Sequence, residues 1–190
     1  MGKSSSGKDT IYKRLLEEMD IKRVVSYTTR PIRENEQDGV EYHFCTKDQE
    51  NLFEQEGKII EKRTYHTVHG PWDYFTVDDG LVDLNAHDYL MIGTLEAYES
   101  LCRYYTKDKI VPIYIEVEDG IRLSRALQRE MQQQNPKYEE MCRRFLGDAK
   151  DFSKERLEEC KITKIFQNKE LEHTVSEIVA YINEQNQVIN

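Results

Sequence analysis

The stretch "GKSSSGKDTIYKRLLEEM" (residues 2–19) opens the sequence with a glycine-rich loop that runs directly into a helical pattern. From Gly2 to Lys8 it fits the spacing G-x-x-x-x-G-K. Apolar residues at Ile11 and Leu15 then begin a four-residue repeat, as in an amphipathic helix. Glycines in such a loop let backbone N–H groups turn toward a phosphate, and the start of the helix adds its positive dipole end. The stretch therefore predicts a phosphate-binding loop at the head of a helix in an α/β protein.

In this loop Lys8 would supply a point charge for the β- and γ-phosphate oxygens of a nucleoside triphosphate. The Ser or Thr that usually follows the lysine is absent, because Asp9 stands there and Thr10 comes next. Three interpretations stay open: Asp9 organises Mg²⁺ directly or through water, Thr10 supplies the hydroxyl, or the site is weakened. Both residues are also compatible with an ordinary first helical turn. The residues expected around the triphosphate are Gly2, Ser4, Ser5, Ser6, Gly7, Lys8, Asp9 and Thr10.

The loop raises a question about the sheet, because only Met1 precedes Gly2. Such loops normally follow the carboxyl end of a buried central strand. Losing a central strand would expose two strand edges and remove much of the core. We therefore expect the native protein to begin upstream of Met1, through a truncated or misassigned start.

The rest of the chain alternates strand and helix patterns. Strands are expected at 23–28, 39–44, 58–68, 72–77, 88–93, 109–117 and 161–168, and helices at 46–56, 94–105 and 170–185, with two more joined at "QQQNP" (132–136). The helix at 46–56 starts with a capping-box pattern, Thr46 with Gln49. Strands cluster between about 30 and 83. This predicts a single α/β domain with a parallel sheet core flanked by helices and a mixed or antiparallel insert.

Composition limits the partners. The 190 residues carry a net charge of −9, which repels polyanions, so we expect no nucleic-acid or membrane partner. No apolar run approaches the roughly 18 residues needed to span a bilayer, and we expect no secretory signal, because the N-terminal residues include no apolar stretch. The cysteines are widely spaced and are typical of free thiols in a reducing cytoplasm, where we expect the protein to be located: Cys45, Cys102, Cys142 and Cys160. Monomer and homodimer both stay open.

A second motif lies in "VVSYTTRPIRENEQDGVEYHF" (24–44). Arg30 and Arg33 flank Pro31, which keeps the chain extended or turned. Two neighbouring guanidinium groups suit a phosphate dianion, and Tyr42 could add a hydroxyl donor. On their own the arginines would be read as two solvated surface residues. Next to a phosphate loop they indicate a second anion site.

The order S-x-T-T-R-x-x-R, followed by an acidic residue and Gly-x-x-Tyr-x-Phe, resembles the nucleoside-monophosphate segment of guanylate kinases. The resemblance extends, more faintly, along the whole chain. It implies a P-loop core (1–28, 84–120 and 158–190), a GMP-binding insert (29–83) and a helical lid (121–157). It also implies that the GMP phosphate is held by Arg30, Arg33, Tyr42 and Tyr74.

The resemblance assigns the base as well. Glu61 would accept hydrogen bonds from guanine N1–H and its 2-amino group, and Ser26 and Thr76 would supply hydroxyls. Adenine offers an acceptor at N1 and no 2-amino group, so it would leave the carboxylate unpaired. Read from residue type alone, Glu61 is a solvent-facing strand carboxylate flanked by lysines.

In the lid, "IRLSRALQRE" and "CRRFL" resemble the family's arginine-bearing helices, and Arg125, Arg129 and Arg144 are expected to clamp the transferred phosphate. Arg122 and Arg143 are neighbours that could take these places. "IFQN" resembles the family's stretch near adenine and places Asn168 there. The family's carboxylates after the next core strand are missing, since Ile92 and Thr94 stand at those positions.

The implied activity is Mg²⁺-dependent phosphoryl transfer from ATP to GMP, or dGMP, giving ADP and GDP. Two alternatives remain: a non-catalytic or weakly active guanylate-kinase-like binding module, and a related kinase acting on another phosphate such as ribose 1,5-bisphosphate. His66 and His69 lack further nearby ligands, so the sequence favours a surface hairpin over a metal site there.

Overall fold

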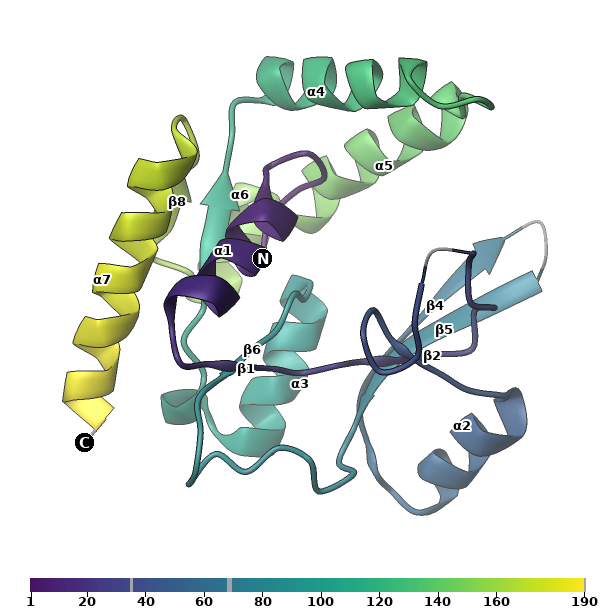
Figure 1. Ribbon diagram of the computed structural model, residues 1–190, viewed down its shortest axis with the longest axis vertical. Helices are drawn as coiled ribbons and strands as arrows, with labels where there is room; N and C mark the ends of the chain where they lie inside the picture. The colour runs from purple at the N-terminus through teal and green to yellow at the C-terminus, as the bar shows by residue number, and fades with distance from the viewer. Residues whose placement is uncertain (35, 68–69, 190) are drawn as a thin grey trace.

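The computed structural model describes residues 1–34, 36–67 and 70–189, and its elements form a core, an insert and a helical pair (Figure 1). The helices are α1 (Lys8–Glu18), α2 (Lys47–Gln55), α3 (Leu95–Tyr105), α4 (Asp119–Met131), α5 (Tyr138–Asp151), α6 (Lys154–Glu159), α7 (Leu171–Ile189) and the 3-10 turn η1 (Lys107–Lys109). The strands are β1 (Lys22–Arg23), β2 (Tyr27–Thr28), β3 (His43–Phe44), β4 (Ile59–Thr67), β5 (Gly70–Val77), β6 (Tyr89–Leu90), β7 (Tyr114–Glu116) and β8 (Ile165–Gln167).

The core strands are all parallel, as predicted. β1 pairs with β6, and β7 pairs with β8, with helices packed around both pairs. Within the part of the chain that the structure describes, the two pairs do not join into one continuous sheet. A cavity of about 400 Å³ lies in the core, with residues of β6 and of the segment before β7 in its wall. The sequence pattern predicted longer strands at 88–93 and 109–117, so the paired parts of β6 and β7 are shorter than expected.

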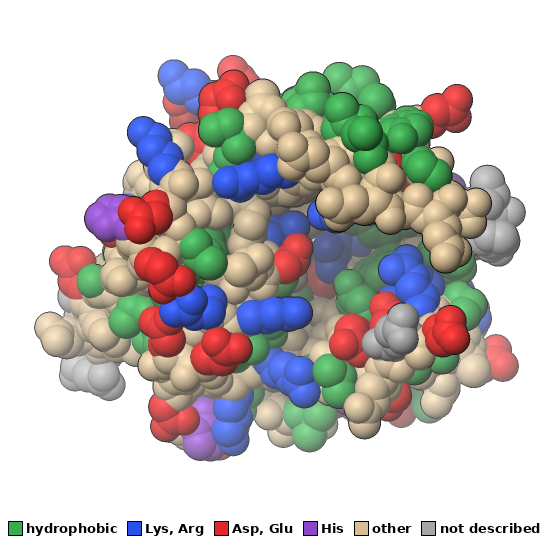
Figure 2. All heavy atoms as spheres, turned by 45° about the horizontal axis from the view of Figure 1, so that its top comes forward, with side chains coloured by type: hydrophobic (Ala, Val, Ile, Leu, Met, Phe, Trp, Pro, Cys, Tyr) green, Lys and Arg blue, Asp and Glu red, His purple; other side chains and the backbone are tan. Residues whose placement is uncertain are grey.

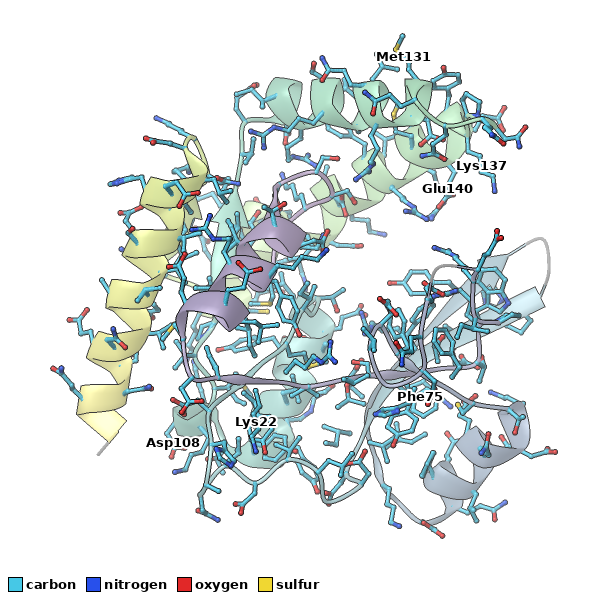
Figure 3. All side chains as sticks on the ribbon, viewed as in Figure 1. Lys22, Phe75, Asp108, Met131, Lys137 and Glu140 are labelled. Atoms are coloured by element: carbon cyan, nitrogen blue, oxygen red, sulfur yellow. The ribbon has the colours of Figure 1, made fainter. Side chains whose placement is uncertain are left out.

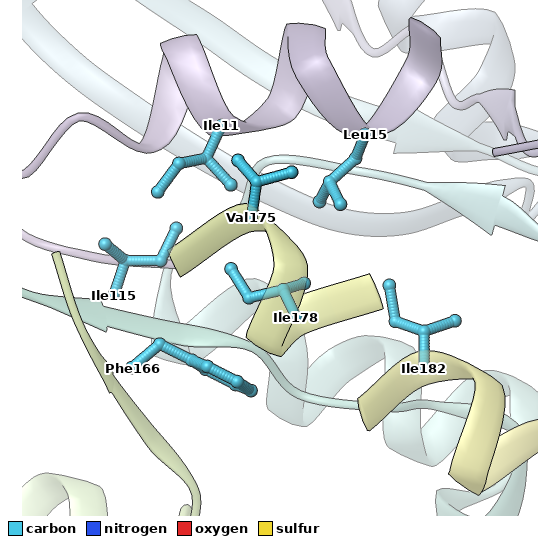
Figure 4. Packing of buried hydrophobic residues seen from close by; sticks show 7 residues of the cluster. All are labelled: Ile11, Leu15, Ile115, Phe166, Val175, Ile178 and Ile182. Atoms are coloured by element: carbon cyan, nitrogen blue, oxygen red, sulfur yellow. The ribbon is translucent and has the colours of Figure 1, made fainter. Parts of the chain in front are cut away.

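One face of the core is closed by α1 and α7. Seven buried side chains from α1, β7, β8 and α7 pack together here (Figure 4): Ile11, Leu15, Ile115, Phe166, Val175, Ile178 and Ile182. Burying each large apolar side chain contributes about 1.5–3 kcal/mol. The predicted amphipathic repeat of α1 is therefore confirmed, and it fixes α1 against α7.

A second cluster lies around α3 and α6. The ring of Tyr114 on β7 stacks on Phe152 with 5.6 Å between centroids. Leu95 and Tyr98 of α3 and Leu157 of α6 complete the cluster with neighbouring buried residues. The four cysteines are free thiols, as expected.

The insert is a four-stranded sheet in the order β3-β2-β5-β4. β4 and β5 form a long antiparallel hairpin, β2 joins β5 antiparallel, and β3 joins β2 in parallel, so the sheet is mixed as predicted. α2 covers it through Phe53, whose ring meets those of Tyr27 and the fully buried Phe75 (Figure 3). α2 begins with the predicted capping box of Thr46 and Gln49.

Two predicted strands differ in the structure. The strand expected at 23–28 is divided, because Lys22–Arg23 pairs with core strand β6 whereas Tyr27–Thr28 pairs with β3 and β5 of the insert. The strand expected at 39–44 shrinks to β3, because Gly39 has φ 76° and its N–H donates to the Tyr42 carbonyl, closing a turn. The β-rich stretch at 23–28 therefore leads the chain from core to insert.

The lid region consists of α4 and α5, which pack against each other. α5 begins at Tyr138, so Pro136 lies before the helix and not in its first turn. Within the described residues, no helix is both long and apolar enough to cross a membrane. The same part of the chain holds no cluster of three or more metal-ligating His, Cys, Asp or Glu side chains.

Candidate functional site

The phosphate loop spans the residues between Met1 and α1, and its two glycines are required by close contacts. A Cβ on Gly2 would lie 2.6 Å from the backbone oxygen of Ile115. Gly7 has φ 86°, and a Cβ there would lie 2.5 Å from the Asn168 side-chain nitrogen. The loop is thus held tightly against the ends of β7 and β8, with Lys8 as the first residue of α1. The geometry is that of an anion-binding loop at a helix N-terminus.

Asn168, which the resemblance assigned to the adenine end, lies against the loop. Its side-chain nitrogen donates to the Ser6 carbonyl at 2.8 Å, and the residue is buried. The hydroxyls of Ser5 and Ser6 are buried and have no hydrogen-bond partner among the described residues. Asn168 therefore supports the phosphate loop through the Ser6 carbonyl.

Lys8 and Asp9 stand together at the head of α1. Their charged groups are 3.7 Å apart, and the Asp9 side chain is 73% exposed whereas that of Lys8 is 23% exposed. Thr10 is exposed on the next position of the same turn. The carboxylate and hydroxyl are accessible from solvent, and Lys8 lies in the wall of the core cavity.

The lid is tied to the loop by Arg122, which is only 1% exposed. Its guanidinium donates to the Ser4 carbonyl at 3.0 Å and to Asp119 at 2.6 Å. From α5, the Asp148 carboxylate accepts from the Ser4 backbone N–H at 2.7 Å. The guanidinium lowers the pKa of Asp119 through this hydrogen bond, so the pair stays charged. Residues from both lid helices therefore hold the loop at Ser4.

This anchor orients the arginines predicted for the lid. Arg125 and Arg129 are exposed on α4, and at 100° per residue they project within about 60° of Arg122 around the helix axis. Both therefore lie on the side of α4 that faces the loop. Arg144 is one helical turn from Asp148 on α5 and shares its side.

Arg144 is not free in this structure. It donates to Glu140 at 2.7 Å, and Arg143 donates to the same carboxylate at 2.6 Å. These two arginines, Arg143 first, lower the pKa of Glu140 to about 2. Glu140 lies on the side of α5 that faces the insert (Figure 3). The pair of arginines thus stands opposite the insert with one carboxylate between them.

In the insert, Arg30 is buried and Arg33 is exposed. The two terminal nitrogens of Arg30 donate to both oxygens of Glu36, at 2.8 and 2.9 Å. Burial alone would lower the pKa of Arg30, but the bonds to Glu36 outweigh it and raise the pKa. The same bonds lower the pKa of Glu36, whose carboxylate also accepts from the Arg33 backbone N–H at 2.9 Å. Glu36 occupies the fork that sequence reasoning assigned to a phosphate.

Two predicted tyrosines lie beside Arg30. Its guanidinium carbon is 5.6 Å from the ring centre of Tyr42, and the Tyr42 and Tyr74 rings are 5.4 Å apart in an edge-on arrangement. Burial raises the pKa of Tyr42, so its hydroxyl is a neutral donor. The structure therefore brings Arg30, Tyr42 and Tyr74 together, with Arg33 at the rim.

The predicted base-recognition pair also meets. Glu61 is 5% exposed, and its carboxylate accepts from the Thr76 hydroxyl at 2.8 Å. Arg63 donates to the same carboxylate at 3.0 Å. Since Arg63 faces Tyr74 across the hairpin, it connects Glu61 to the arginine–tyrosine cluster. Ser26 lies just before β2 and is half-buried.

An ion-pair network fixes the insert behind this site. Lys47 of α2 bonds Asp73 at 2.8 Å and the fully buried Glu50 at 2.7 Å. The backbone of Asp73 in turn accepts from the Thr28 hydroxyl, which also accepts from the Arg30 N–H at 3.1 Å. These bonds link α2 to the Arg30 backbone through Asp73 on β5 and Thr28 on β2, and so they hold Arg30 in place.

Figure 2 shows a hollow in this face of the molecule with Lys and Arg side chains around it. Sequence reasoning missed three residues beside the predicted ones, Glu36, Arg63 and Asp148, and it also missed the structural role of Arg122. Thr94, at a position where the family has a carboxylate, caps α3 through the Ala97 N–H at 3.3 Å. His66 lies in β4, and His69 falls outside the described residues.

Each comparison of this chain with known proteins matches guanylate kinases. The guanylate kinase family model matches residues 1–72. The guanylate kinase of Neisseria gonorrhoeae is 42% identical over 91 residues, 47% of this chain and 42% of the relative. That of Chlorobium luteolum is 43% identical over 67 residues, 35% of this chain and 34% of the relative. The matched segments thus span less than half the length of these relatives.

The fold agrees along the whole chain. The crystal structure of guanylate kinase from Anaplasma phagocytophilum superimposes with a TM-score of 0.64 and 21% identity, covering 97% of this chain and 83% of that one. The resemblance to guanylate kinases is confirmed.

The guanylate kinase match divides the site into two parts. Residues 1–72 contain the phosphate loop, the two insert arginines, Tyr42 and Glu61. The lid arginines and Asn168 lie beyond that range, where the likeness to the solved guanylate kinase is one of fold.

Proposed function

We propose that this protein is a guanylate kinase that transfers the γ-phosphoryl group of ATP to GMP, giving ADP and GDP. The observation that carries the proposal is the insert pocket, where a buried carboxylate bonded to a hydroxyl, Glu61 with Thr76, adjoins a cluster of Arg30 and two tyrosines. One side suits a guanine edge and the other a phosphate dianion. dGMP is a further expected substrate, because these groups recognise base and phosphate.

On the acceptor side, the phosphate of GMP would replace Glu36 at the Arg30 fork. The carboxylate is planar and the phosphate is tetrahedral, but each can present two oxygens to the same two nitrogens, and the phosphate brings the greater charge. Tyr42 and Tyr74 then add neutral donors beside it. Arg33, which is exposed, can swing inward to the second side of the phosphate.

For the base, Glu61 would accept from N1–H and the 2-amino group of guanine. Thr76 already donates to one oxygen of this carboxylate and so fixes its orientation. The carboxylate is buried, so an adenine would leave it without a matching donor. Arg63 would stay beside the carboxylate as its ion-pair partner.

On the donor side, the loop amides and Lys8 would hold the triphosphate of ATP at the head of α1. Arg125, Arg129 and Arg144 would close from the lid and neutralise charge on the transferred group. Mg²⁺ fits the donor set at this point, because Asp9 and Thr10 offer an accessible carboxylate and hydroxyl, and Mg²⁺ typically uses one or two carboxylates plus substrate phosphates. When bound, it would neutralise phosphate charge.

An ADP-release assay with GMP, dGMP, AMP, UMP and ribose 1,5-bisphosphate as acceptors tests the proposal. We expect turnover with GMP and dGMP alone. Turnover with ribose 1,5-bisphosphate but not with GMP would contradict it, because Glu61 has no purpose without a guanine. In the same assay, an Asp9→Ala variant with unchanged Mg²⁺ dependence would remove Asp9 from metal binding.

A second candidate is a binding module that holds nucleotides without transferring phosphate. The observation in its favour is that both recognition groups are already paired, Arg30 with Glu36 and Glu61 with Arg63. Saturable GMP binding with no ADP release, at any Mg²⁺ concentration, would favour this candidate over the kinase.

A further inference from the structure

The carboxylate of Glu61, which the proposed function assigns to guanine, already has a cationic partner in Arg63. Both residues lie on β4, two positions apart, so their side chains lie on the same face of the strand. Nε of Arg63 donates to one carboxylate oxygen at 3.0 Å, and Nη2 donates to the other at 3.3 Å. The side chain of Arg63 is 18% exposed, whereas that of Glu61 is 2% exposed. The guanidinium thus contacts the carboxylate and lies nearer to solvent.

The face of the hairpin that carries these two residues is turned away from α2. Lys62, between them, points the other way and bonds carboxylates of α2 at 2.9 and 3.3 Å. Across the hairpin, Thr76 is the partner of Glu61. Tyr74 is the partner of Arg63 and belongs to the cluster expected to hold the phosphate. Arg63 therefore stands between the residues expected to bind the base and those expected to bind the phosphate.

The two groups that bond Glu61 differ in the number of donors they have left. A threonine hydroxyl has one proton, and that of Thr76 is already donated to Glu61 at 2.8 Å. A guanidinium has five N–H groups, and the hydrogen bonds between described residues use two of those of Arg63. Arg63 is therefore the partner of Glu61 that has donors to spare.

The edge of guanine that would face Glu61 carries an acceptor as well as two donors. N1–H and the 2-amino group are the donors, and O6, next to N1, is the acceptor. A carboxylate can accept from both donors but cannot donate to O6, so it satisfies only part of the edge. Arginine N–H groups are the commonest specific donors to guanine O6 in protein–DNA contacts. A carboxylate and a guanidinium side by side therefore match the whole edge.

We propose that Arg63 is a specificity-determining residue that donates to guanine O6 while Glu61 accepts from N1–H and the 2-amino group. This inference rests on the proposed function, because it needs a guanine at Glu61. Arg63 would give up the longer of its two bonds, at 3.3 Å, since the oxygen that accepts it also accepts from Thr76. Adenine has an amino group in place of O6, so its donors would face those of Arg63. The ion pair would then reject adenine at two positions.

The test compares ligands that differ by one group. 6-Thioguanosine monophosphate keeps N1–H and the 2-amino group and replaces O6 with sulfur, which is a weak acceptor. We expect the wild-type chain to bind GMP at least about 10-fold more tightly than this analogue, and Arg63→Met to bind the two within about threefold of each other. Lys62→Met, the matched control on the opposite face of β4, should keep the wild-type ratio. Calorimetric titration of the three proteins measures these ratios.

Two further ligands identify the group that Arg63 contacts. Inosine monophosphate lacks the 2-amino group and guanosine lacks the phosphate, so the affinity of GMP relative to each should change by less than about threefold in Arg63→Met. A 6-thio ratio that keeps its wild-type value in Arg63→Met would overturn the proposal, because Arg63 would then be only a structural partner of Glu61. A collapse of the GMP-to-guanosine ratio would also overturn it, because Arg63 would then bind the phosphate. No binding of GMP by the wild-type chain would overturn the proposed function itself, and this inference with it.

A measurement on the wild-type protein does not depend on how Arg63→Met folds. With isotope-labelled arginine, the side-chain N–H signals of Arg63 can be assigned by their absence in Arg63→Lys. These NMR signals should move on addition of GMP and of inosine monophosphate, which both carry O6. With 6-thioguanosine monophosphate the movement should be at most about half as large, because the acceptor is weaker. Equal movements with all three ligands would overturn the proposal.

Discussion

The guanidinium of Arg122 on α4 donates to the backbone carbonyl of Ser4 in the phosphate loop, across 118 positions of sequence. Asp148 on α5 accepts from the N–H of the same residue. Ser4 is thus held at both its donor and its acceptor by the lid helices. The lid and the loop are mechanically linked before any nucleotide binds.

Arg122→Ala should destabilise the protein by about 2–3 kcal/mol, because it leaves Asp148 and the Ser4 carbonyl without the buried cation that both contact. Arg125→Ala is a matched control on an exposed position of the same helix, and we expect it to change the free energy of unfolding by less than about 0.5 kcal/mol. Urea unfolding of both variants measures the difference. Equal losses would show that Arg122 is not the anchor.

Glu61→Gln should weaken GMP binding by at least about 30-fold, which corresponds to about 2 kcal/mol from the loss of charged hydrogen bonds. The amide cannot accept from two neighbouring donors as the carboxylate does. KM for ATP should stay within about twofold, since the loop is remote. Steady-state kinetics separates the two, with Glu56→Gln at an exposed position as control. A parallel loss for both nucleotides would indicate a damaged fold.

Glu36→Gln should act in opposite directions on stability and on binding. It removes the charge that pairs with buried Arg30, so the free energy of unfolding should fall by about 1–2 kcal/mol. It also removes the carboxylate that competes with phosphate, so GMP should bind about 5-fold more tightly, an effect of about 1 kcal/mol. Glu34→Gln, an exposed neighbour, should do neither. Weaker GMP binding in Glu36→Gln would mean that Glu36 supports the site instead of competing for it.

Stability should rise with pH between about 5 and 8 in protein that retains a free Met1 amino group. Burial, with Lys8 nearby, lowers the pKa of this amine to about 5 from its ordinary 8.0. Between these values the unfolded chain binds a proton that the folded chain does not, so unfolding becomes less favourable as pH rises. The full effect is at most about 4 kcal/mol, at about 1.36 kcal/mol per pKa unit.

The measurement compares urea unfolding at pH 5.5 and 7.5 for the free and the N-terminally acetylated protein. Acetylation keeps an N–H that can donate to Ile113 and removes the titrating group. The rise in stability should be smaller in the acetylated protein. The same rise in both proteins would assign the pH dependence to other groups.

The local sequence pattern was sufficient to predict most helices and strands, and to place the residues whose positions follow from the spacing of a motif. The phosphate loop follows from glycines and a lysine at set intervals before an apolar repeat, so Lys8 falls at the start of α1 as predicted. The resemblance assigned Glu61 and Thr76 to the same base, and the structure brings the two into contact across the hairpin. These features depend on residues close in sequence or on a single hairpin.

The features that the sequence did not predict are contacts between the motif residues and their neighbours in space, and these contacts depend on tertiary packing. The bond of Arg30 to Glu36 requires the turn geometry of 31–36, and that of Asp148 to Ser4 requires the packing of α5 on the loop. The division of 23–28 between two sheets was equally hidden, since both halves favour strand and only long-range pairing decides their partners.

Calorimetric titration with GMP, inosine monophosphate and AMP tests the central claim most directly, because the three differ at the groups that face Glu61. We predict that GMP binds, that inosine monophosphate, which keeps N1–H but lacks the 2-amino group, binds at least about 10-fold more weakly, and that AMP shows no measurable heat. Equal affinity for GMP and AMP, or no uptake of GMP with or without ATP, would contradict the account.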